Sequence, residues 1–402
     1  MLSSKRIQKA LKHPKPTPPW GAEPLLGSIY GEEEIDAAVA AMRDSMDFKK
    51  GFGFSAPPIP DFEQAFARHC GTKHAVAINS AGPGLDMAMR YLKLKRGDEV
   101  IVPAVNYQAS PLAVLGAGGK IVWGDIDPRT FELDPHDVER KITPRTRAIF
   151  PVHMNGLSAP MDDLIAVGKR HPHEKHGPIP VIGDAARACG GGYKGTRIGK
   201  KGLMTVFSFH TMKNMTTLGE GGMVTTDDDE VEKFCRSVRM YGAAVEAWGT
   251  SNVMTKVQAA VGLVQLGKLD GFIAARRRLA KARDEMLDGL KEVTTPYEPR
   301  GSEHSYYLYT CLVPKEWAGE KRDRIMQMMA DEFGICCVVA NRPAYLSRKL
   351  LAQNTKGQRL PVSEAITARL FCVSIHPAMD DALNEYICAA LITCVERIRK
   401  GG

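Results

Sequence analysis

The chemistry that the sequence suggests starts from one lysine, Lys213, which lies between two short apolar runs and directly before a glycine cluster. The runs 203–209 and 222–226 are rich in β-forming residues, so residues 211–221 are predicted to form a turn between two strands. An amine held on such a turn can be partly desolvated, which lowers its pKa and frees the lone pair that attacks a carbonyl group. Lys213 is therefore a candidate for Schiff-base chemistry, and the alternative is a solvated loop lysine.

A second candidate is the segment 79–85, NSAGPGL, which follows an apolar run and opens a helical pattern. Pro83 suits the first helical turn because its missing N–H group costs nothing there. The backbone N–H groups of Ala81 and Gly82 would then face an anion at the positive end of the helix dipole. The segment predicts a phosphate-binding turn, with a plain strand-to-helix turn as the alternative.

Two further side chains follow runs that predict strands. Asp184 comes at the carboxyl end of the run 180–183, a poor place for a structural carboxylate in a buried sheet. Tyr107 lies in the loop after the run 99–103, where a tyrosine on its own more often serves packing. Asp184 is a candidate functional carboxylate, whereas the residues alone leave Tyr107 undecided.

The elements that would position these residues alternate between strand and helix from Asp61 onward, with short connections. This alternation predicts an α/β fold with a mostly parallel sheet covered by helices on both faces. Ligands of such sheets bind beyond the carboxyl ends of the strands. The strands expected at 74–78, 99–103, 180–183 and 206–209 all end close before candidate residues.

The chain is predicted to consist of three parts. Residues 1–20 are polar, basic and rich in proline, which predicts either a flexible arm or an extended strand that lies on a partner. Residues 21–275 would form a large domain and residues 276–402 a smaller α/β domain, joined by the helical pattern of residues 258–285. Within the large domain, the glycine- and proline-rich stretch 47–60 predicts a long loop.

The composition is ordinary for a soluble globular protein: 402 residues, 44% hydrophobic and 25% charged. No apolar run approaches the roughly 20 residues that span a bilayer, and the N-terminus lacks the hydrophobic part of a signal peptide, so we expect a cytoplasmic protein that does not bind membranes. The net charge of +8 is dispersed, which favours a generally basic surface over an anionic substrate such as a nucleotide sugar and does not support nucleic-acid binding. The nine cysteines lack metal-binding spacing, so we expect reduced core thiols and no metal site.

The pattern around the lysine has a close parallel in a known family. S-F-H-x-x-K-N at 208–214, followed by G-E-G-G at 219–222, closely resembles the lysine segment of the DegT/DnrJ/EryC1/StrS aminotransferases. The resemblance extends from about residue 31 to about residue 398. These enzymes use pyridoxal 5'-phosphate (PLP), and most of them aminate keto sugars. The resemblance implies a fold-type-I PLP transferase, with a mostly parallel sheet between helix layers and a smaller C-terminal α/β domain.

The resemblance also implies roles for single residues. Lys213 would carry the cofactor as an internal aldimine, and would act as general base and acid once freed. Asp184 would pair with the protonated pyridine nitrogen, which keeps the ring positive and able to delocalise a carbanion. Ser208 would contact the cofactor phosphate, and Tyr107 would stack on the pyridine ring, a contact worth about 1 kcal/mol.

Three places differ from the family pattern. The family has glycine and threonine where this chain has Ala81 and Gly82, so a hydroxyl contact to the phosphate is lost while backbone contacts remain. Where Gln or His usually contacts the cofactor hydroxyl, this chain has Arg187, which would bond either the phenolate oxygen or a substrate anion, with a solvent-facing side chain as a third option. Asn252 stands one position later than the family asparagine that reaches the neighbouring subunit's cofactor phosphate, and Val253 replaces an arginine.

The resemblance predicts a PLP-dependent transaminase of class EC 2.6.1 that acts in amino-sugar biosynthesis. It would move an amino group from glutamate or glutamine to a keto sugar, expected to be nucleotide-linked, while the cofactor passes through its amine form, PMP. A site shared across subunits implies at least a homodimer. The alternatives are a PLP-dependent sugar dehydratase, against which Lys213 argues because such members usually have histidine there, and a non-catalytic regulatory homologue.

Overall fold

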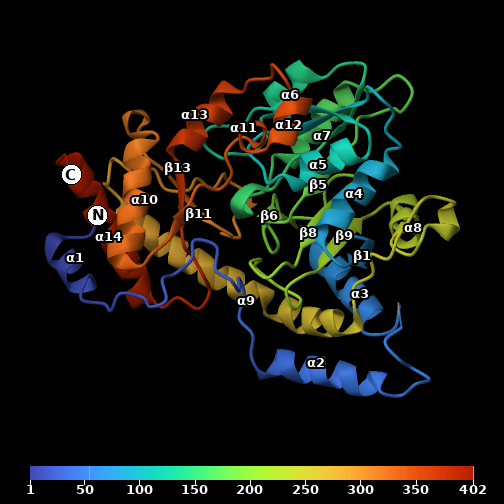
Figure 1. Ribbon diagram of the computed structural model, residues 1–402, viewed down its shortest axis with the longest axis horizontal. Helices are drawn as coiled ribbons and strands as arrows, with labels where there is room; N and C mark the ends of the chain where they lie inside the picture. Colours follow the sequence, from blue (N-terminus) through green and yellow to red (C-terminus); the bar gives the residue numbers. More distant parts are fainter. Residues whose placement is uncertain (54, 402) are drawn as a thin grey trace.

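The computed structural model describes residues 1–53 and 55–401 of the chain. Phe54, within the predicted 47–60 loop, and Gly402, at the end of the predicted small domain, lie outside the described residues. Figure 1 shows a large sheet region on one side and a smaller C-terminal region on the other, with the long helix α9 (Lys256–Leu287) running between them.

Seven strands form the large sheet, in the spatial order β3-β2-β4-β5-β8-β9-β1. Its two hydrogen-bonded groups, β3-β2-β4 and β5-β8-β9-β1, meet where residues 149 and 152 form parallel bridges to residues 181 and 184. Neighbouring strands run parallel except β9, which is antiparallel to both β8 and β1. The strands are β1 (His74–Ile78), β2 (Glu99–Pro103), β3 (Lys120–Gly124), β4 (Thr146–Ile149), β5 (Ile182–Asp184), β8 (Met204–Ser208) and β9 (Gly222–Thr226). The prediction of a mostly parallel α/β sheet is confirmed.

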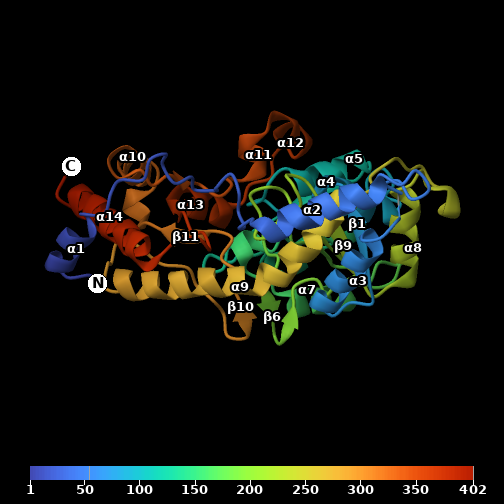
Figure 2. The same ribbon diagram turned by 90° about the horizontal axis from the view of Figure 1, so that it is seen from below.

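Helices cover both faces of this sheet, as Figure 2 shows from below. Successive strand residues point to opposite faces, so Val206 and Val224 face one core whereas Phe207 and Met223 face the other. The first face carries α4 (Ala81–Tyr91), α5 (Ala109–Gly116) and α8 (Asp229–Val238). The second carries α3 (Ile59–Cys70), α6 (Pro135–Lys141), α7 (Met161–Arg170) and the first half of α9.

The C-terminal region is a second layered unit. Its antiparallel sheet has the order β11-β13-β12, and α10 and α14 pack with it around one core that also contains Leu279 of α9. The division of the chain at residue 275 stays a prediction, because α9 runs through that point. The elements here are β11 (Tyr309–Leu312), β12 (Cys337–Val338), β13 (Leu370–Val373), α10 (Glu320–Phe333), α13 (Pro361–Arg369) and α14 (Asp381–Arg399). Shorter elements are α11 (Ala344–Ser347), α12 (Lys349–Asn354), β6 (Gly192–Tyr193), β7 (Thr196–Arg197), β10 (Ser302–Glu303) and the 3-10 turns at Met154–Gly156, Ala243–Val245 and Lys315–Trp317.

The N-terminal segment differs from the flexible or extended arm expected from its composition. Residues Ser4–Ala10 form the helix α1, which lies against α14 beside the C-terminus (Figure 1). Leu2 is buried in the C-terminal core, and Arg6 forms an ion pair of 2.6 Å with Glu385 of α14. A helix this short is not stable alone, so tertiary contacts that the local sequence does not reveal decide its structure.

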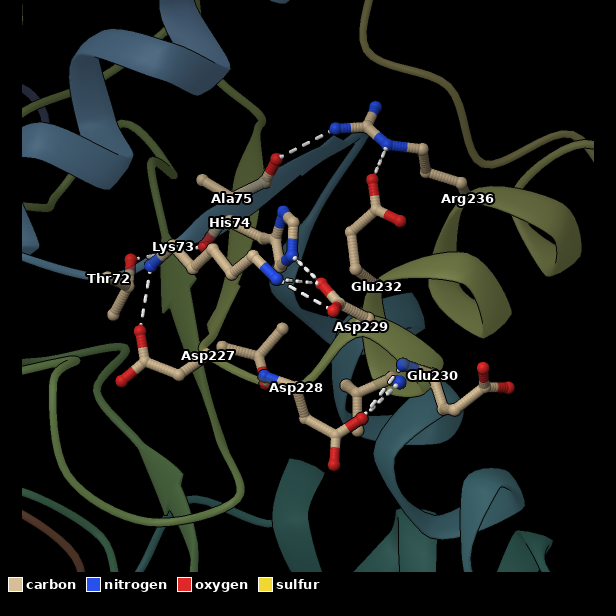
Figure 3. Close-up of polar contacts among 12 residues, drawn as sticks. Thr72, Lys73, His74, Ala75, Asp227, Asp228, Asp229, Glu230, Glu232 and Arg236 are labelled. Atoms are coloured by element: carbon tan, nitrogen blue, oxygen red, sulfur yellow. Dashed lines mark hydrogen bonds and ion pairs between the residues drawn. The ribbon is translucent and has the colours of Figure 1, made fainter.

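Charged side chains fasten the start of β1 to the end of β9 and to α8 (Figure 3). The Lys73 backbone N–H donates to Asp227 Oδ1 at 2.7 Å, and both Lys73 Nζ and the His74 ring contact Asp229 at 2.6 Å. Asp228 caps α8, because its Oδ1 accepts hydrogen bonds from the N–H groups two and three residues later at 2.8 and 3.0 Å. The outermost strand β1 is thereby held at its amino end, whereas the candidate residues lie at the carboxyl ends of the strands.

Within residues 1–53 and 55–401, no helix has the length and apolar character needed to cross a membrane, and no three potential metal-ligating side chains come together. All nine cysteines are free thiols, and seven of them are buried. The prediction of core thiols is confirmed for these seven, whereas Cys336 and Cys337 are half-buried.

Candidate active site

Lys213 lies on the loop between β8 and β9, beyond the carboxyl end of β8. Its Nζ donates a hydrogen bond of 3.2 Å to the hydroxyl oxygen of Tyr307 and lies 4.6 Å from the centre of that ring. Burial, and then the positive charge of Arg187, lower the pKa of Lys213 to about 8. The amine is therefore partly desolvated and is not an ordinary solvated loop lysine.

Asp184 is the last residue of β5, next to β8, and is buried. The Ser110 hydroxyl donates a hydrogen bond to its Oδ2, and the Ala186 N–H donates one of 3.0 Å to its Oδ1. Burial raises the pKa of Asp184, while these hydrogen bonds and the positive charges of Lys213 and Arg187 oppose the rise. The structure thus brings the carboxylate, the amine and the guanidinium group into one electrostatic cluster.

Arg187 is buried, which excludes the solvent-facing option for its side chain. Its Nη1–H donates a hydrogen bond of 3.3 Å to Asn155 Oδ1, and its guanidinium carbon lies 5.6 Å from the centre of the Tyr307 ring. Asn155 is held in turn by a hydrogen bond of 2.9 Å from its Nδ2 to Thr310 Oγ1. The guanidinium group is therefore fixed next to Lys213, where two positive charges favour an anionic ligand.

The predicted phosphate-binding turn lies at the N-terminus of α4, which begins at Ala81 after an extended Ser80. The side chain of Ser80 does not cap the described helix, so the N–H groups of its first turn, including that of Gly82, are available to an anion. Gly222 on β9 packs directly on this turn. A Cβ at Gly222 would lie 2.8 Å from the Ser80 carbonyl carbon and 2.9 Å from the Ala81 nitrogen, so glycine is required for this close approach.

The three remaining predicted residues lie at the same edge of the sheet. Ser208 ends β8, and its Oγ accepts a hydrogen bond of 3.3 Å from the His210 N–H. Tyr107 follows β2 and is 53% exposed, so protein packing accounts for only part of its surface. Asn252 lies beside the phosphate-binding turn of its own chain, because its carbonyl oxygen accepts a hydrogen bond of 3.0 Å from the Asn79 N–H. Its predicted contact with a neighbouring subunit's phosphate stays a prediction.

Residues 21–28, here called the strap, lead from the C-terminal region across the lysine loop toward α2 (Glu32–Ser45). Gly27 packs so closely on this loop that a Cβ there would lie 2.4 Å from the carbonyl oxygen of Lys213. Glu23 of the strap accepts a hydrogen bond from the Tyr307 hydroxyl group. The strap therefore brings a carboxylate to the residue that contacts the Lys213 amine.

Arg276 of α9 fastens the strap to the rest of the molecule. Its side chain is buried, and burial lowers its pKa to about 10. It donates to three carbonyl oxygens, those of Gly27 at 2.6 Å, Tyr306 at 3.0 Å and Ile375 at 2.8 Å. One side chain thus ties the strap, the segment before β11 and the segment after β13 together.

The sequence analysis did not assign Glu23, Ser110 or Asn155 to the site, and Tyr307 was indicated only through the segment 305–309, which resembles a family segment near the substrate end of the site. Ser110 carried a usable signal, because it stands three residues after Tyr107 in the same strand-end loop and helix. Glu23 carried none, since 284 residues separate it from Tyr307 and only the fold brings the two together.

These groups fit the cofactor that the sequence resemblance implies. An anion-binding helix N-terminus, a buried carboxylate and an amine of lowered pKa all lie at the carboxyl ends of β1, β5 and β8. They suit the phosphate, the pyridine nitrogen and the aldehyde carbon of PLP, respectively. The fold and the site define the class: an α/β enzyme that binds PLP.

A model of the DegT/DnrJ/EryC1/StrS aminotransferase family matches residues 30–392, and the chain belongs to this family. It is a PLP-dependent aminotransferase. Solved structures of sugar aminotransferases are similar to this structure, with TM-scores of 0.86 and 0.82. This similarity confirms the fold-type-I architecture.

Two relatives and one pair of structures illustrate the similarity. The chain is 36% identical over 342 residues to the GDP-perosamine synthase of Caulobacter vibrioides. This alignment covers 83% of this chain and 89% of that protein. It is 32% identical to DesV of S. venezuelae, solved in complex with a ketimine intermediate, with a TM-score of 0.82 over 91% of this chain and 96% of that one. Spr1654 from Streptococcus pneumoniae, solved in a PMP form, gives a TM-score of 0.86 at 26% identity over 94% of this chain and 98% of that one. Its PLP form gives 0.85 at 27% identity over 93% and 99%.

Proposed function

We propose that this enzyme transfers the amino group of L-glutamate or L-glutamine to a nucleotide-linked keto sugar, as a step in the biosynthesis of an amino sugar. The observation that carries the proposal is the 36% identity to a GDP-perosamine synthase over most of both chains. The lysine at position 213 supports transamination over the dehydratase alternative, because the amine is needed to release and re-form the bond to the cofactor.

Lys213 is the residue that we assign to the Schiff base and to proton transfer. With a pKa of about 8, about a quarter of the amine is neutral at pH 7.5, compared with about one part in a thousand for an ordinary lysine. PLP, once bound, supplies the electron sink that makes the α-hydrogen of the amino donor acidic. The neutral amine of Lys213 then takes that proton and returns it to the product.

Asp184 and Arg187 are assigned to the ring of the cofactor and to an anion beside it. The buried Asp184 carboxylate holds the pyridine nitrogen protonated, because a positive partner offsets the unfavourable burial of its charge. Arg187 keeps donors free beyond its bond to Asn155, and these serve either the phenolate oxygen of the cofactor or an anionic group of the substrate.

The phosphate of the cofactor is assigned to the N-terminus of α4. The N–H groups of Ala81 and Gly82 provide the backbone contacts, and the Ser208 hydroxyl provides a side-chain contact from the neighbouring part of the sheet edge. The half-exposed ring of Tyr107 is assigned to stacking on the pyridine ring.

We further propose that the enzyme is a homodimer with shared active sites. Large apolar side chains are exposed on the strap, on α2 and its following loop, on the lysine loop and between α8 and α9, a distribution typical of a subunit interface next to a site. They are Leu25, Ile35, Met42, Met46, Phe48, Leu218, Tyr241 and Trp248. The position of Asn252 near the phosphate-binding turn supports a role for its segment in that interface.

The test is made on the purified protein. We expect a visible aldimine band that bleaches with L-glutamate or with L-glutamine, and an amine in place of the keto oxygen in a nucleotide-linked sugar, detected by mass spectrometry. Lys213→Ala should abolish both signals, whereas Lys169→Ala, an exposed lysine on α7, should abolish neither. A colourless protein after added PLP, or turnover by Lys213→Ala, would contradict the proposal. Light scattering should give the mass of two 44.0 kDa chains, and a monomer would contradict the shared site.

A further inference from the structure

The hydroxyl group of Tyr307 lies between the reactive amine and a carboxylate. It accepts a hydrogen bond of 3.2 Å from Lys213 Nζ and donates one to Glu23 Oε1. While Lys213 is an ammonium group and Glu23 a carboxylate, the bonds have this direction, because an ammonium group only donates and a carboxylate only accepts. A continuous hydrogen-bonded path therefore leads from Lys213 through Tyr307 to Glu23.

The path leads outward. Tyr307 is buried, with 4% of its surface exposed, whereas Glu23 on the strap is only half-buried and meets solvent. Arg276 fixes the strap by its bond of 2.6 Å to the Gly27 carbonyl oxygen, four residues from Glu23. The carboxylate at the outer end is thus held in position while part of its surface remains in contact with water.

We propose that Tyr307 and Glu23 form a proton relay that discharges and recharges Lys213 during turnover. The inference rests on the proposed role of Lys213. In the discharge step, an N–H bond of the Lys213 ammonium group breaks and its proton forms a new O–H bond on Tyr307, while the original hydroxyl proton of Tyr307 moves to Glu23. The products are a neutral amine, an unchanged tyrosine and a neutral carboxylic acid, so the step needs no co-reactant. The reverse step restores the ammonium group.

The two transfers occur together. Burial raises the pKa of Tyr307 well above its ordinary value, so a tyrosinate is not a stable intermediate. Tyr307 touches the reacting nitrogen and is a catalytic residue, whereas Glu23 acts through Tyr307 and is a positioning residue.

The charges around Lys213 predict how its protonation responds to change. Burial and Arg187 lower the pKa of Lys213, while Glu23, Asp184 and Glu220 raise it. Glu23→Gln should therefore lower this pKa further, and it also breaks the relay. The two effects are separable, because a lower pKa leaves more neutral amine at every pH, whereas a broken relay slows its formation only where the amine starts protonated.

The test is a single-turnover measurement on the holoenzyme, mixed with amino donor at pH 6.5 and at pH 9.5. Tyr307→Phe and Glu23→Gln should react about tenfold more slowly than the wild type at pH 6.5, where the Lys213 amine is protonated once the donor has freed it, and within about twofold of it at pH 9.5. Glu23→Asp keeps a carboxylate and should recover part of the loss.

Two matched variants control for the loss of a tyrosine hydroxyl group and for the loss of a glutamate charge outside the relay. Tyr306→Phe removes the hydroxyl of the neighbouring buried tyrosine, which stacks on His304 at 4.1 Å. Glu220→Gln removes a negative charge that acts on Lys213 only through space. Both should stay within about twofold of the wild type at both pH values.

A second readout reports the amine itself. Excess donor converts the cofactor to its amine form and frees Lys213, whose pKa is then measured by competitive labelling and mass spectrometry. The pKa of Lys213 should be lower in Glu23→Gln than in the wild type, and it should not be lower in Glu23→Asp. An unchanged pKa in Glu23→Gln would overturn the contact on which the relay depends.

The remaining outcomes separate the relay from the assignment of Lys213. An equal rate loss at both pH values would mean a structural role for Tyr307 and Glu23 and would overturn the relay. Wild-type rates in both variants, with Lys213→Ala inactive, would overturn the relay and leave the aminotransferase assignment intact. Turnover by Lys213→Ala would overturn the assignment itself. If Tyr307→Phe does not fold, as judged by near-ultraviolet circular dichroism, the rates of Glu23→Gln, whose substitution lies on the half-buried strap, decide whether the relay exists.

Discussion

Ser110 is predicted to control the ionisation of Asp184, and Ser110→Ala tests this. The Ser110 hydroxyl donates to Asp184 Oδ2 inside the buried site, while the Ala186 N–H holds the other oxygen. A hydrogen bond to a charged group contributes about 1.5–3 kcal/mol. Ser110→Ala removes such a bond and should therefore raise the pKa of Asp184 further.

The effect of Ser110→Ala on stability depends on pH with a definite sign. Burial already raises the folded-state pKa of Asp184 above its unfolded value, so the ionised carboxylate is less favourable in the folded chain than in the unfolded one. Stability is lost as the pH rises from the unfolded to the folded pKa, and the substitution moves the upper end of this interval further up. The extra destabilisation is absent below the unfolded pKa, about 4, and complete above the folded pKa of the variant.

The assay is thermal unfolding of the cofactor-free protein at pH 4.5 and at pH 8.5. For 402 residues unfolding as one unit, the entropy of unfolding is about 0.8 kcal/mol/K, so 1.5–3 kcal/mol lowers the Tm by about 2–4 °C. We expect this difference at pH 8.5 and a smaller one at pH 4.5. The matched control is Ser237→Ala, a buried serine whose Oγ has no hydrogen-bond partner among the described residues. The same loss of Tm at both pH values would refute the reasoning and reduce Ser110 to a packing residue.

Three further predictions concern the scaffold. Asp228→Ala removes the cap of α8 and should lower the free energy of unfolding by about 1 kcal/mol, whereas Glu230→Ala should not; equal stability of Asp228→Ala and the wild type in thermal unfolding would be a contradiction. Gly222→Ala places a Cβ 2.8 Å from the backbone of the phosphate-binding turn, so PLP affinity should fall at least about tenfold in an absorbance titration. Gly267→Ala, whose Cβ meets no described atom within 4 Å, should bind PLP like the wild type, and equal affinity of both variants would disprove the tight contact. Arg276→Met leaves three buried carbonyl oxygens without their donor and should cost about 3 kcal/mol, and a change in Tm below 1 °C would show that the strap is held otherwise.

The large sheet and its carboxyl-end residues could be predicted because their signals are local. The apolar runs that form β1, β2 and β8 are bounded by polar or glycine-rich segments, and the observed strands match the expected ranges to within about two residues at most ends. Asp184 at the end of β5 follows from the same pattern, since a polar residue at the end of a buried strand has few other places to go. Ala81 at the start of α4 follows from the turn before Pro83, which suits the first turn of a helix.

The parts that could not be predicted depend on contacts between distant segments. The helix α1 has only seven residues, and its folding depends on Leu2 in the C-terminal core and on the pair between Arg6 and Glu385. Glu23 sits in a segment without regular structure whose position is set by α9 and the lysine loop. No local pattern encodes such an arrangement, because the partners lie hundreds of residues apart.

The strap gives the site a property that neither sheet region has alone. Lys213 comes from the large sheet, Tyr307 from the segment leading into β11, and Glu23 from the strap between them. Arg276 binds the strap and both flanks of the C-terminal sheet through carbonyl oxygens, so a shift of that sheet relative to α9 displaces Tyr307 and Glu23 together. The charge of Glu23 raises the pKa of Lys213, so the fraction of neutral amine depends on how the two sheet regions are held against each other.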